Sequence, residues 1–274
     1  MATVATIKQK AEVSKSTQLK TLIEKSLAEL GKAVPSCMNA ERLGRIALTT
    51  IRLNPKLAEC TPESFLGALF QSAQLGLEPN VEGQAYLIPY TNSKKINGEW
   101  VKVNEVQFQI GYKGYIELFY RHSSAEFVDM HTVYENDIFE CEYGSNAHIK
   151  HIPTFKNRGE VIGYYAVAKI KNGGSIFKFM NLEECLEHGK THSKCIDKAT
   201  GNFQKGSVWD KDQNAMCKKT VLIQLAKLMP KSIELQKALA MDGTTKSNVS
   251  ADMFNIPDTT NWVEDYNNVA HPTE

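Results

Sequence analysis

One short stretch of the chain, residues 106–121, brings together groups that could bind a phosphate chain. Its sequence is VQFQIGYKGYIELFYR. Apolar residues alternate with Gln107 and Gln109 at its start, which predicts a strand with one face in a core and both amides facing outward. Gly111 and Gly114 then bracket a turn into a helix, where backbone N–H groups could approach an anion closely. A strand-turn-helix junction also needs glycine for structural reasons, so both interpretations stay open.

The charges of the chain are unevenly distributed, although its net charge is only +1. Residues 205–237 carry seven lysines against three acidic residues, whereas residues 240–274 carry one lysine against six acidic residues. The sequence therefore predicts a basic element followed by an acidic tail.

The basic element is expected to be one long helix at about residues 210–229. Helical spacing places Lys219, Lys227 and two polar neighbours, Thr220 and Gln224, on one side of it and an apolar stripe on the other. Lys211 and Lys218 project toward the apolar stripe, so they either extend past its edge or lie in a groove between this helix and the sheet. A solvated lysine face is the plain alternative. The chain also has a basic hairpin tip, which contains Lys94 and Lys95, and the Gly-Tyr-Lys-Gly turn. Together they make phosphate binding the better interpretation, because lysines track phosphates while aromatic rings stack on bases.

Four residues of types that bind zinc occur between positions 185 and 195, namely Cys185, His188, His192 and Cys195. Offsets of three, four and three place them on one side of a single helix, whereas a tetrahedral site usually gathers ligands from two elements. The segment 189–191, Gly-Lys-Thr, resembles the end of a phosphate-binding loop, but Glu184 stands where that motif requires glycine. These patterns argue against zinc binding and against ATP hydrolysis.

The remaining acidic residues and histidines form no recognisable catalytic set. His148 and His151 could join a metal site with Asp137 or Glu140, although surface histidines are the commoner alternative. No GxSxG, HExxH or EF-hand motif is present. The sequence therefore predicts no catalytic residue, no metal and no cofactor.

Composition and length are those of a globular protein. The chain has 274 residues, of which 42% are hydrophobic and 23% are charged, values ordinary for a globular fold. Its six cysteines are scattered without a CxxC pair, which favours reduced thiols over a disulfide frame. No apolar run approaches the roughly 18 residues needed to cross a bilayer, and the N-terminus lacks an apolar signal-peptide core. We therefore expect a cytoplasmic protein.

The pattern of apolar residues predicts an α+β fold. Helices are expected at about 17–31, 39–53, 62–76, 181–189, 210–229 and 232–241, with another beginning near Tyr115. A β-hairpin is expected at about 84–109, with a polar tip at 91–98 that contains Lys94 and Lys95, and further strands are expected at 126–134, 137–143, 161–170 and 175–180. The tail from Asp242 onward is too polar to fold alone and is expected to be mobile.

Three segments, in this order and spacing, resemble the RecT family of phage-type single-strand annealing proteins. They are QSAQLGLEPNVEGQAYLIPY (71–90), VQFQIGYKGYIEL (106–118) and WDKDQNAMCKKTVLIQLAKLMPKSIELQKALAMD (209–242). The general resemblance extends from about residue 40 to residue 242. It implies a core related to that of the phage lambda beta protein, in which a β-hairpin and an antiparallel sheet pack on a long helix and N-terminal helices precede them.

The resemblance also implies a function and partners. Proteins of this family bind single-stranded DNA, assemble into rings or helical filaments, and anneal complementary strands without ATP in phage recombination. A 5′-to-3′ exonuclease and a host single-strand-binding protein are the expected partners. We expect three segments: an N-terminal helical, oligomerisation segment (1–35), a DNA-binding and annealing core (36–241) and a flexible acidic tail (242–274).

Annealing requires that one strand be held by its backbone so that its base edges stay exposed. We assign Lys113, Lys218, Lys219 and Lys227 to phosphates. Arg121, Lys94, Lys95 and Lys102 form a second tier of cations, and Lys211 is a further candidate DNA-binding residue. Tyr112, Tyr115, Gln107 and Gln109 are candidate base or sugar contacts.

Two other functions remain compatible with these residues. A passive single-strand-coating protein would share the basic groove but would sequester strands instead of pairing them. A metal-dependent nuclease is a more distant alternative, which loss of DNA length in the presence of magnesium would reveal.

Overall fold

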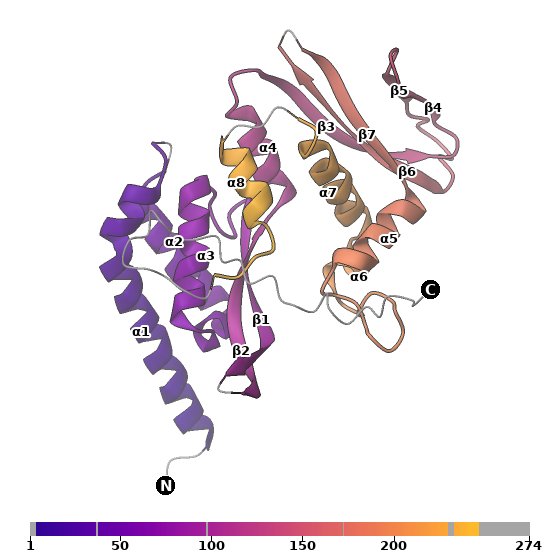
Figure 1. Ribbon diagram of the computed structural model, residues 1–274. Coiled ribbons are helices and arrows are strands. Elements are labelled where there is room, and N and C mark those ends of the chain that lie inside the picture. The colour runs from indigo at the N-terminus through magenta and orange to yellow at the C-terminus, as the bar shows by residue number, and fades with distance from the viewer. Residues whose placement is uncertain (1–3, 37, 97, 172, 230–232, 247–274) are drawn as a thin grey trace. The chain divides into compact units, whose positions relative to one another are not determined.

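The structure is a computed structural model that describes residues 4–36, 38–96, 98–171, 173–229 and 233–246 (Figure 1). The chain forms two compact units. Unit 1 contains residues up to Gly114 and those from Gln236 onward, and unit 2 contains Tyr115–Leu235. The predicted α+β class is confirmed, because helices pack with antiparallel hairpins and sheets in these units.

Unit 1 begins with a helical layer. It consists of α1 (Val4–Ala33), α2 (Ala40–Leu53), the short 3₁₀ helix η1 (Pro55–Glu59) and α3 (Pro62–Leu75). The Asn39 side chain accepts hydrogen bonds from the first turn of α2 and caps this helix. Pro62 starts α3, where the sequence predicts this helix to begin. Gly76 ends α3 with a left-handed φ of 59°, a conformation that glycine adopts without strain. Almost every residue of α3 is buried, so this helix is the centre of the core of unit 1.

A long β-hairpin packs against α3 in unit 1. Its strands β1 (Ala85–Ile96) and β2 (Glu99–Ile110) pair without a register shift from Ala85 opposite Ile110 to Ile96 opposite Glu99. The strands therefore continue through most of the segment that the sequence assigned to the polar tip.

Part of the predicted mobile tail is ordered against β2. Gly243 N donates to Phe108 O at 3.0 Å, and Phe108 N donates to Thr244 O at 3.2 Å. Thr244, Thr245 and Lys246 are buried. The expectation of a mobile tail is wrong for residues 242–246, because backbone hydrogen bonds to a strand compensate for their low apolar content; residues 247–274 lie outside the described part of the chain.

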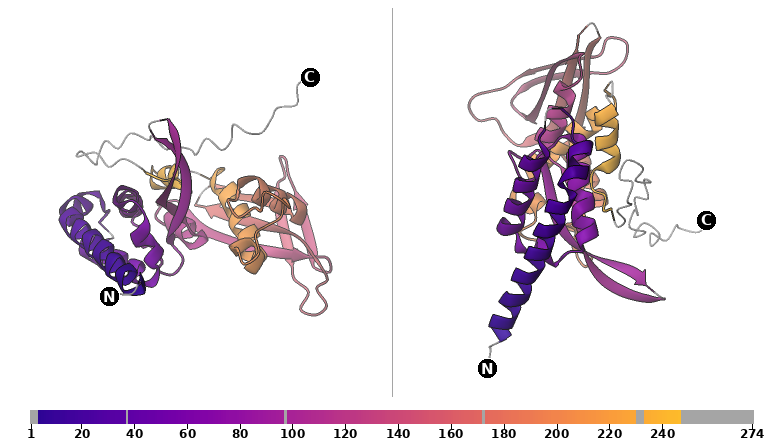
Figure 2. Two further views of the ribbon diagram at one scale, coloured as in Figure 1. Left: turned by 90° about the horizontal axis from the view of Figure 1, so that it is seen from below. Right: turned by 90° about the vertical axis from the view of Figure 1, so that its left-hand side faces the viewer.

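Unit 2 is built on a three-stranded antiparallel sheet. The order is β3 (Ala125–Tyr134), β6 (Val161–Ile170) and β7 (Gly174–Asn181), so β3 is an edge strand. Helices α5 (Leu182–His192) and α7 (Gln213–Ala226) pack on this sheet (Figure 2). Strands β4 (Ile138–Glu142) and β5 (His148–Ile152) form a separate hairpin. Helix α4 (Tyr112–Tyr120) begins at the end of unit 1, and α8 (Ile233–Met241) ends in it.

The predicted single helix at 210–229 is two helices. The short α6 (Val208–Lys211) ends at Asp212, whose backbone leaves the helical region with φ −146°. The Asp212 carboxylate then accepts a hydrogen bond from Ala215 N at 3.0 Å and caps α7. The aspartate side chain takes a backbone N–H group that would otherwise bond to a carbonyl of a continuous helix, which explains the break. Elsewhere in the described residues, no helix has the length and apolar character needed to cross a membrane.

Candidate nucleic-acid interface

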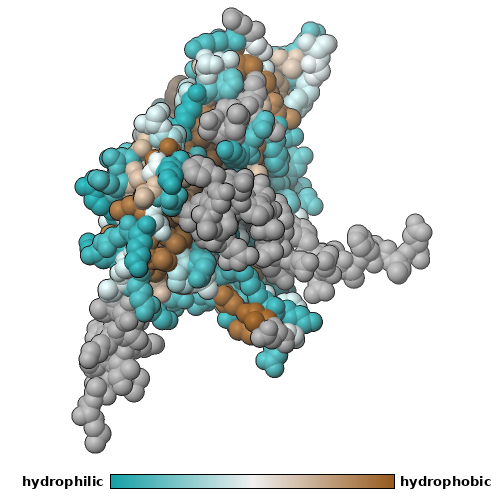
Figure 3. Space-filling model, turned by 60° about the vertical axis from the view of Figure 1, so that its left-hand side comes forward, coloured by the Kyte–Doolittle hydropathy of each residue, from teal (hydrophilic) through white to brown (hydrophobic). Residues whose placement is uncertain are grey.

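The tip of the β1–β2 hairpin exposes cations together with large apolar side chains. Lys95 and Lys102 are exposed, and Trp100 between them in the hairpin is 73% exposed. Figure 3 shows hydrophobic and hydrophilic surface side by side at this tip. The sequence assignment missed Trp100, although an indole in an otherwise polar hairpin tip is the signal that could have identified it. Lysines with an exposed aromatic ring suit a nucleic-acid strand, because the lysines neutralise phosphates and the ring can stack on a base.

Lys94, in contrast, is not a free cation. Its Nζ lies 2.6 Å from Oε1 of Glu105, a carboxylate that is almost fully buried. Asn92 Nδ2 donates to the other oxygen of Glu105 at 3.0 Å. Lys94 therefore stabilises a buried acid inside the hairpin, which weakens its assignment to phosphate.

The two glycines of the Gly-Tyr-Lys-Gly segment serve packing within unit 1. Gly111 N donates to Gln84 O at 2.9 Å, and Gly114 N donates to Gly111 O at 3.0 Å. A Cβ atom on Gly111 would lie 1.9 Å from Gly83 O, and one on Gly114 would lie 2.2 Å from Gln84 O. The N–H groups of both glycines are therefore already used, and these close contacts support the structural interpretation of the turn. That other backbone N–H groups at the start of α4 bind an anion stays a prediction.

The side chains of this segment divide between surface and core. Tyr112 and Lys113, at the start of α4, are exposed and accessible to a ligand. Tyr115 is only 2% exposed, so its assignment as a base contact is wrong in this conformation. The first turn of α4 therefore has Tyr112 and Lys113 on its exposed face and Tyr115 on its buried face.

The two glutamines of β2 do not both face solvent as predicted. Gln107 is 3% exposed, and its Nε2 donates to Gly243 O. Gln109 is half-buried and lies 3.4 Å from the Tyr90 hydroxyl. The outward orientation predicted for Gln107 is wrong because residues 242–246 cover this part of β2.

In unit 2, α6 and α7 carry a row of lysines. Lys211 and Lys227 are exposed, and Lys227 Nζ donates to Gln224 Oε1 at 3.3 Å. Lys218 and Lys219 are half-buried and pair with no carboxylate of the described residues. Thr220, predicted on the polar side, is buried instead, and its hydroxyl donates to Met216 O at 3.0 Å.

Arg121, which follows α4, forms an ion pair with Glu117. Its Nε lies 3.4 Å from Glu117 Oε1, one helical turn away. The assigned cations thus form two sets in two different units. Lys94, Lys95, Lys102 and Lys113 belong to unit 1, and Arg121, Lys211, Lys218, Lys219 and Lys227 belong to unit 2.

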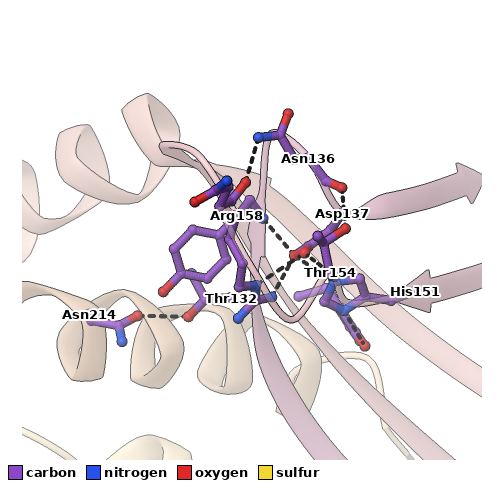
Figure 4. A network of polar contacts seen from close by, with 10 residues as sticks. Thr132, Asn136, Asp137, His151, Thr154, Arg158 and Asn214 are labelled. Carbon is purple, nitrogen blue, oxygen red and sulfur yellow. Dashed lines mark hydrogen bonds and ion pairs between the residues drawn. The ribbon is translucent and has the colours of Figure 1, made fainter.

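A buried carboxylate organises the polar residues at one end of the sheet in unit 2 (Figure 4). The side chain of Asp137 is fully buried. Its Oδ1 accepts from Thr154 N at 2.8 Å and from Arg158 Nε at 3.0 Å. Its Oδ2 accepts from Tyr134 N at 3.0 Å and from Arg158 Nη2, and it lies 3.0 Å from His151 Nε2. The Arg158 guanidinium, helped by His151 and the backbone donors, holds the pKa of Asp137 well below its usual range.

The Asp137 cluster replaces the metal site that the sequence left open. His151 does contact Asp137, but arginine and backbone donors occupy the carboxylate. His148 instead lies 3.5 Å from Glu142, and Lys150 pairs with Glu140 at 3.2 Å. Over the described ranges, no group of three or more His, Cys, Asp and Glu residues could hold a metal ion.

Cys185 and His188 of α5 contribute to packing. Cys185 is fully buried. His188 Nε2 lies 2.8 Å from Gln224 Nε2 on α7, and burial lowers the pKa of His188 to about 4. The contact between His188 and Gln224 joins α5 to α7.

Comparisons with known proteins give one consistent result. The RecT family model matches residues 41–257. Protein RecT of Escherichia coli (strain K12) is 36% identical over 234 residues, which cover 85% of this chain and 82% of that protein. The uncharacterized protein YqaK of Bacillus subtilis (strain 168) is 26% identical over 212 residues, which cover 76% of this chain and 65% of that protein.

Proposed function

The chain belongs to the RecT family, and from this premise we propose that it binds single-stranded DNA and anneals it to a complementary strand without ATP. The observation that most strongly supports this proposal is the extent of the family match, which includes most of unit 1 and all of unit 2. The two sets of lysines agree with it, since cations that track phosphates give binding independent of sequence.

The mechanism follows from what annealing demands. Lys218 and Lys219 on α7 hold the phosphates of the first strand, together with Lys113 and Lys227, and Lys95 and Lys102 add a second tier. Trp100 stacks on a base without reading its identity. Backbone binding leaves the Watson–Crick edges free, so that a second strand can test them.

A strand of many nucleotides requires a groove that continues through neighbouring subunits, so we propose that the protein acts as a ring or helical filament. The N-terminal helices are the proposed contact surface. A hollow of about 270 Å³ between α1 and α2 supports this choice, because Ile23, Leu27 and Leu48 give it an apolar part and charged residues, Glu24, Glu41 and Arg45, complete its lining. Light scattering tests the assembly, and a monomer both with and without single-stranded DNA would contradict it.

The partners in recombination are also part of the proposal. A 5′-to-3′ exonuclease would supply the single strands, and a host single-strand-binding protein would hold them before annealing. Co-purification of either partner with the tagged protein, from cells that produce it with its neighbouring genes, would test this assignment. Recovery of neither partner would contradict it.

Lys219→Ala tests the phosphate contacts on α7. We expect weaker binding to single strands of unrelated sequence, and a slope of log K against log salt that is shallower by about 0.7, the value for one phosphate contact to a single strand. Fluorescence anisotropy over a salt series measures both quantities. Lys169→Ala is the matched control, because Lys169 already pairs with Glu126 at 2.7 Å on the surface of the same unit. A slope unchanged by Lys219→Ala would remove Lys219 from the interface.

A further inference from the structure

Unit 2 contains a cavity of about 310 Å³ near the C-terminal end of the edge strand β3. Residues from β3, β5, β6, α7 and the segment 153–158 line it. Those that matter for binding are His131, Thr132, Tyr134, Arg158, Asn214 and Lys218. This volume is at the lower end of the range for small-molecule sites, about 300 to 1,000 Å³, and is sufficient for one nucleotide unit.

The cavity offers hydrogen-bond donors, and the two carboxylates beside it are already paired, Asp137 with Arg158 and Asp129 with His131, whose Nε2 lies 2.7 Å from Asp129 Oδ2. Lys218 forms no ion pair within the described part of the chain. Asn214 uses its carbonyl oxygen to accept from the Thr132 hydroxyl at 2.7 Å, and its amide nitrogen has no partner in the described ranges. Asp137, behind the wall of the cavity, accepts from Arg158, His151 and two backbone N–H groups, so it repels an anion little. The cavity is therefore suited to a negatively charged group.

Arg158 is fixed before any ligand arrives. Two of its nitrogens donate to Asp137, and its guanidinium carbon lies 4.0 Å from the centre of the Tyr134 ring. The side chain of Arg158 is nevertheless 34% exposed. Arginine has five N–H donors, and only Nε and Nη2 of Arg158 donate to Asp137, so unlike the single ammonium of Lys94 it keeps donors for a second anion. A cation held in place also loses little side-chain entropy on binding, which favours contact with a phosphate.

An aromatic ring completes the cavity. The side chain of His131 is 48% exposed and faces the cavity next to Tyr165, with their ring centres 5.5 Å apart. Because Tyr165 is buried beneath it, His131 is the ring whose surface remains accessible. A base can stack on such a ring whatever its identity.

We propose that this cavity receives one nucleotide of the bound single strand. Lys218 and Arg158 bind its phosphate, and the ring of His131 stacks on its base. The inference rests on the proposed function. It adds that unit 2 contacts a base of the DNA strand as well as its sugar-phosphate backbone. It also gives Lys218 a specific role, since the amine borders a nucleotide-sized cavity beside α7.

The test separates base contacts from phosphate contacts by using two probes. One is a single-stranded oligothymidylate, and the other is a strand of the same length in which every base is missing. We expect His131→Ala to weaken binding of oligothymidylate by at least about fivefold, the smallest loss expected for one stacked base, and to leave binding of the abasic strand unchanged. Lys218→Gln should weaken both strands equally, because both retain their phosphates.

Two further variants make the result interpretable. His148→Ala is the matched control, because His148 is similarly exposed and lies 3.5 Å from Glu142, as His131 lies 2.7 Å from Asp129, but His148 does not line the cavity. His131→Phe retains a ring and should retain affinity for oligothymidylate, which separates stacking from any general loss of structure. Equal losses on both probes for His131→Ala, or no loss on either, would overturn the inference while the proposed function stands. Failure of the wild-type protein to bind either strand would overturn the proposed function itself.

Discussion

Asp137→Ala is expected to lower the free energy of unfolding by about 3 kcal/mol, at the lower end of the range for removing one partner of a buried ion pair because Arg158 is partly exposed. The substitution leaves Arg158, His151 and two backbone N–H groups without the acceptor that joins them. Urea unfolding followed by circular dichroism measures the change.

Glu126→Ala is the control for this prediction. Glu126 pairs with Lys169 at 2.7 Å, but both side chains are about half exposed, so its loss should cost less than about 1 kcal/mol. Equal losses for Asp137→Ala and Glu126→Ala would contradict the central role of the Asp137 cluster.

The same carboxylate predicts a pH dependence. Its pKa is lower in the folded protein than in the unfolded chain, so the unfolded state binds the proton more tightly. The contribution of Asp137 is therefore complete above the ordinary carboxyl pKa of about 4 and is lost as the pH falls toward the lowered value. The difference in unfolding free energy between wild type and Asp137→Asn should stay constant from neutral pH to about pH 5 and shrink below about pH 4.

Gly111→Ala is expected to destabilise unit 1 by about 3 kcal/mol or more, the upper range for overpacking. The new Cβ atom would lie 1.9 Å from the carbonyl oxygen of Gly83, a backbone atom that cannot rotate away. Moving either segment would also stretch the hydrogen bond from Gly111 N to Gln84 O. Thermal unfolding of the two proteins measures the effect.

Gly31→Ala provides the comparison for this substitution. Gly31 lies in α1, and the nearest atom to its added Cβ would be 3.8 Å away. Alanine is preferred to glycine inside a helix by roughly 0.5 to 1 kcal/mol, so this variant should be as stable as the wild type or slightly more stable. If Gly111→Ala had the same melting temperature as the wild type, the backbones at Gly83 and Gly111 would not approach as closely as described.

Local signals in the sequence were sufficient to predict several elements. The predicted helices at 39–53 and 62–76 agree with α2 and α3 within a residue or two, and Pro62 and Gly76 mark the two ends of α3. The hairpin and the strands β3, β6 and β7 follow from alternation and turn residues. In each case the determining residues are neighbours in the chain, so a short window contains the necessary information.

The errors arise where distant segments meet. Gln107 is buried by residues 242–246, and Gly111 is required by the backbone at residues 83 and 84. The Asp137 cluster joins the residue just before β4 to His151 and Arg158, which lie 14 and 21 residues further along the chain. Asp212 interrupts the helix by capping α7. The spacing of apolar residues does not show whether this cap is more stable than a continuous helix. The cations could be found from the sequence, but their partners, as for Lys94 and Glu105, could not.

The most direct test of the central claim is an annealing measurement by energy transfer. The protein is mixed, without nucleotide, with one labelled oligonucleotide, and either the labelled complement or a scrambled strand is then added. The account predicts that the complement pairs faster than in the absence of protein and that the scrambled strand gives no signal. Binding without acceleration would contradict annealing and favour a coating protein, and no binding to either strand would contradict the DNA-binding function altogether.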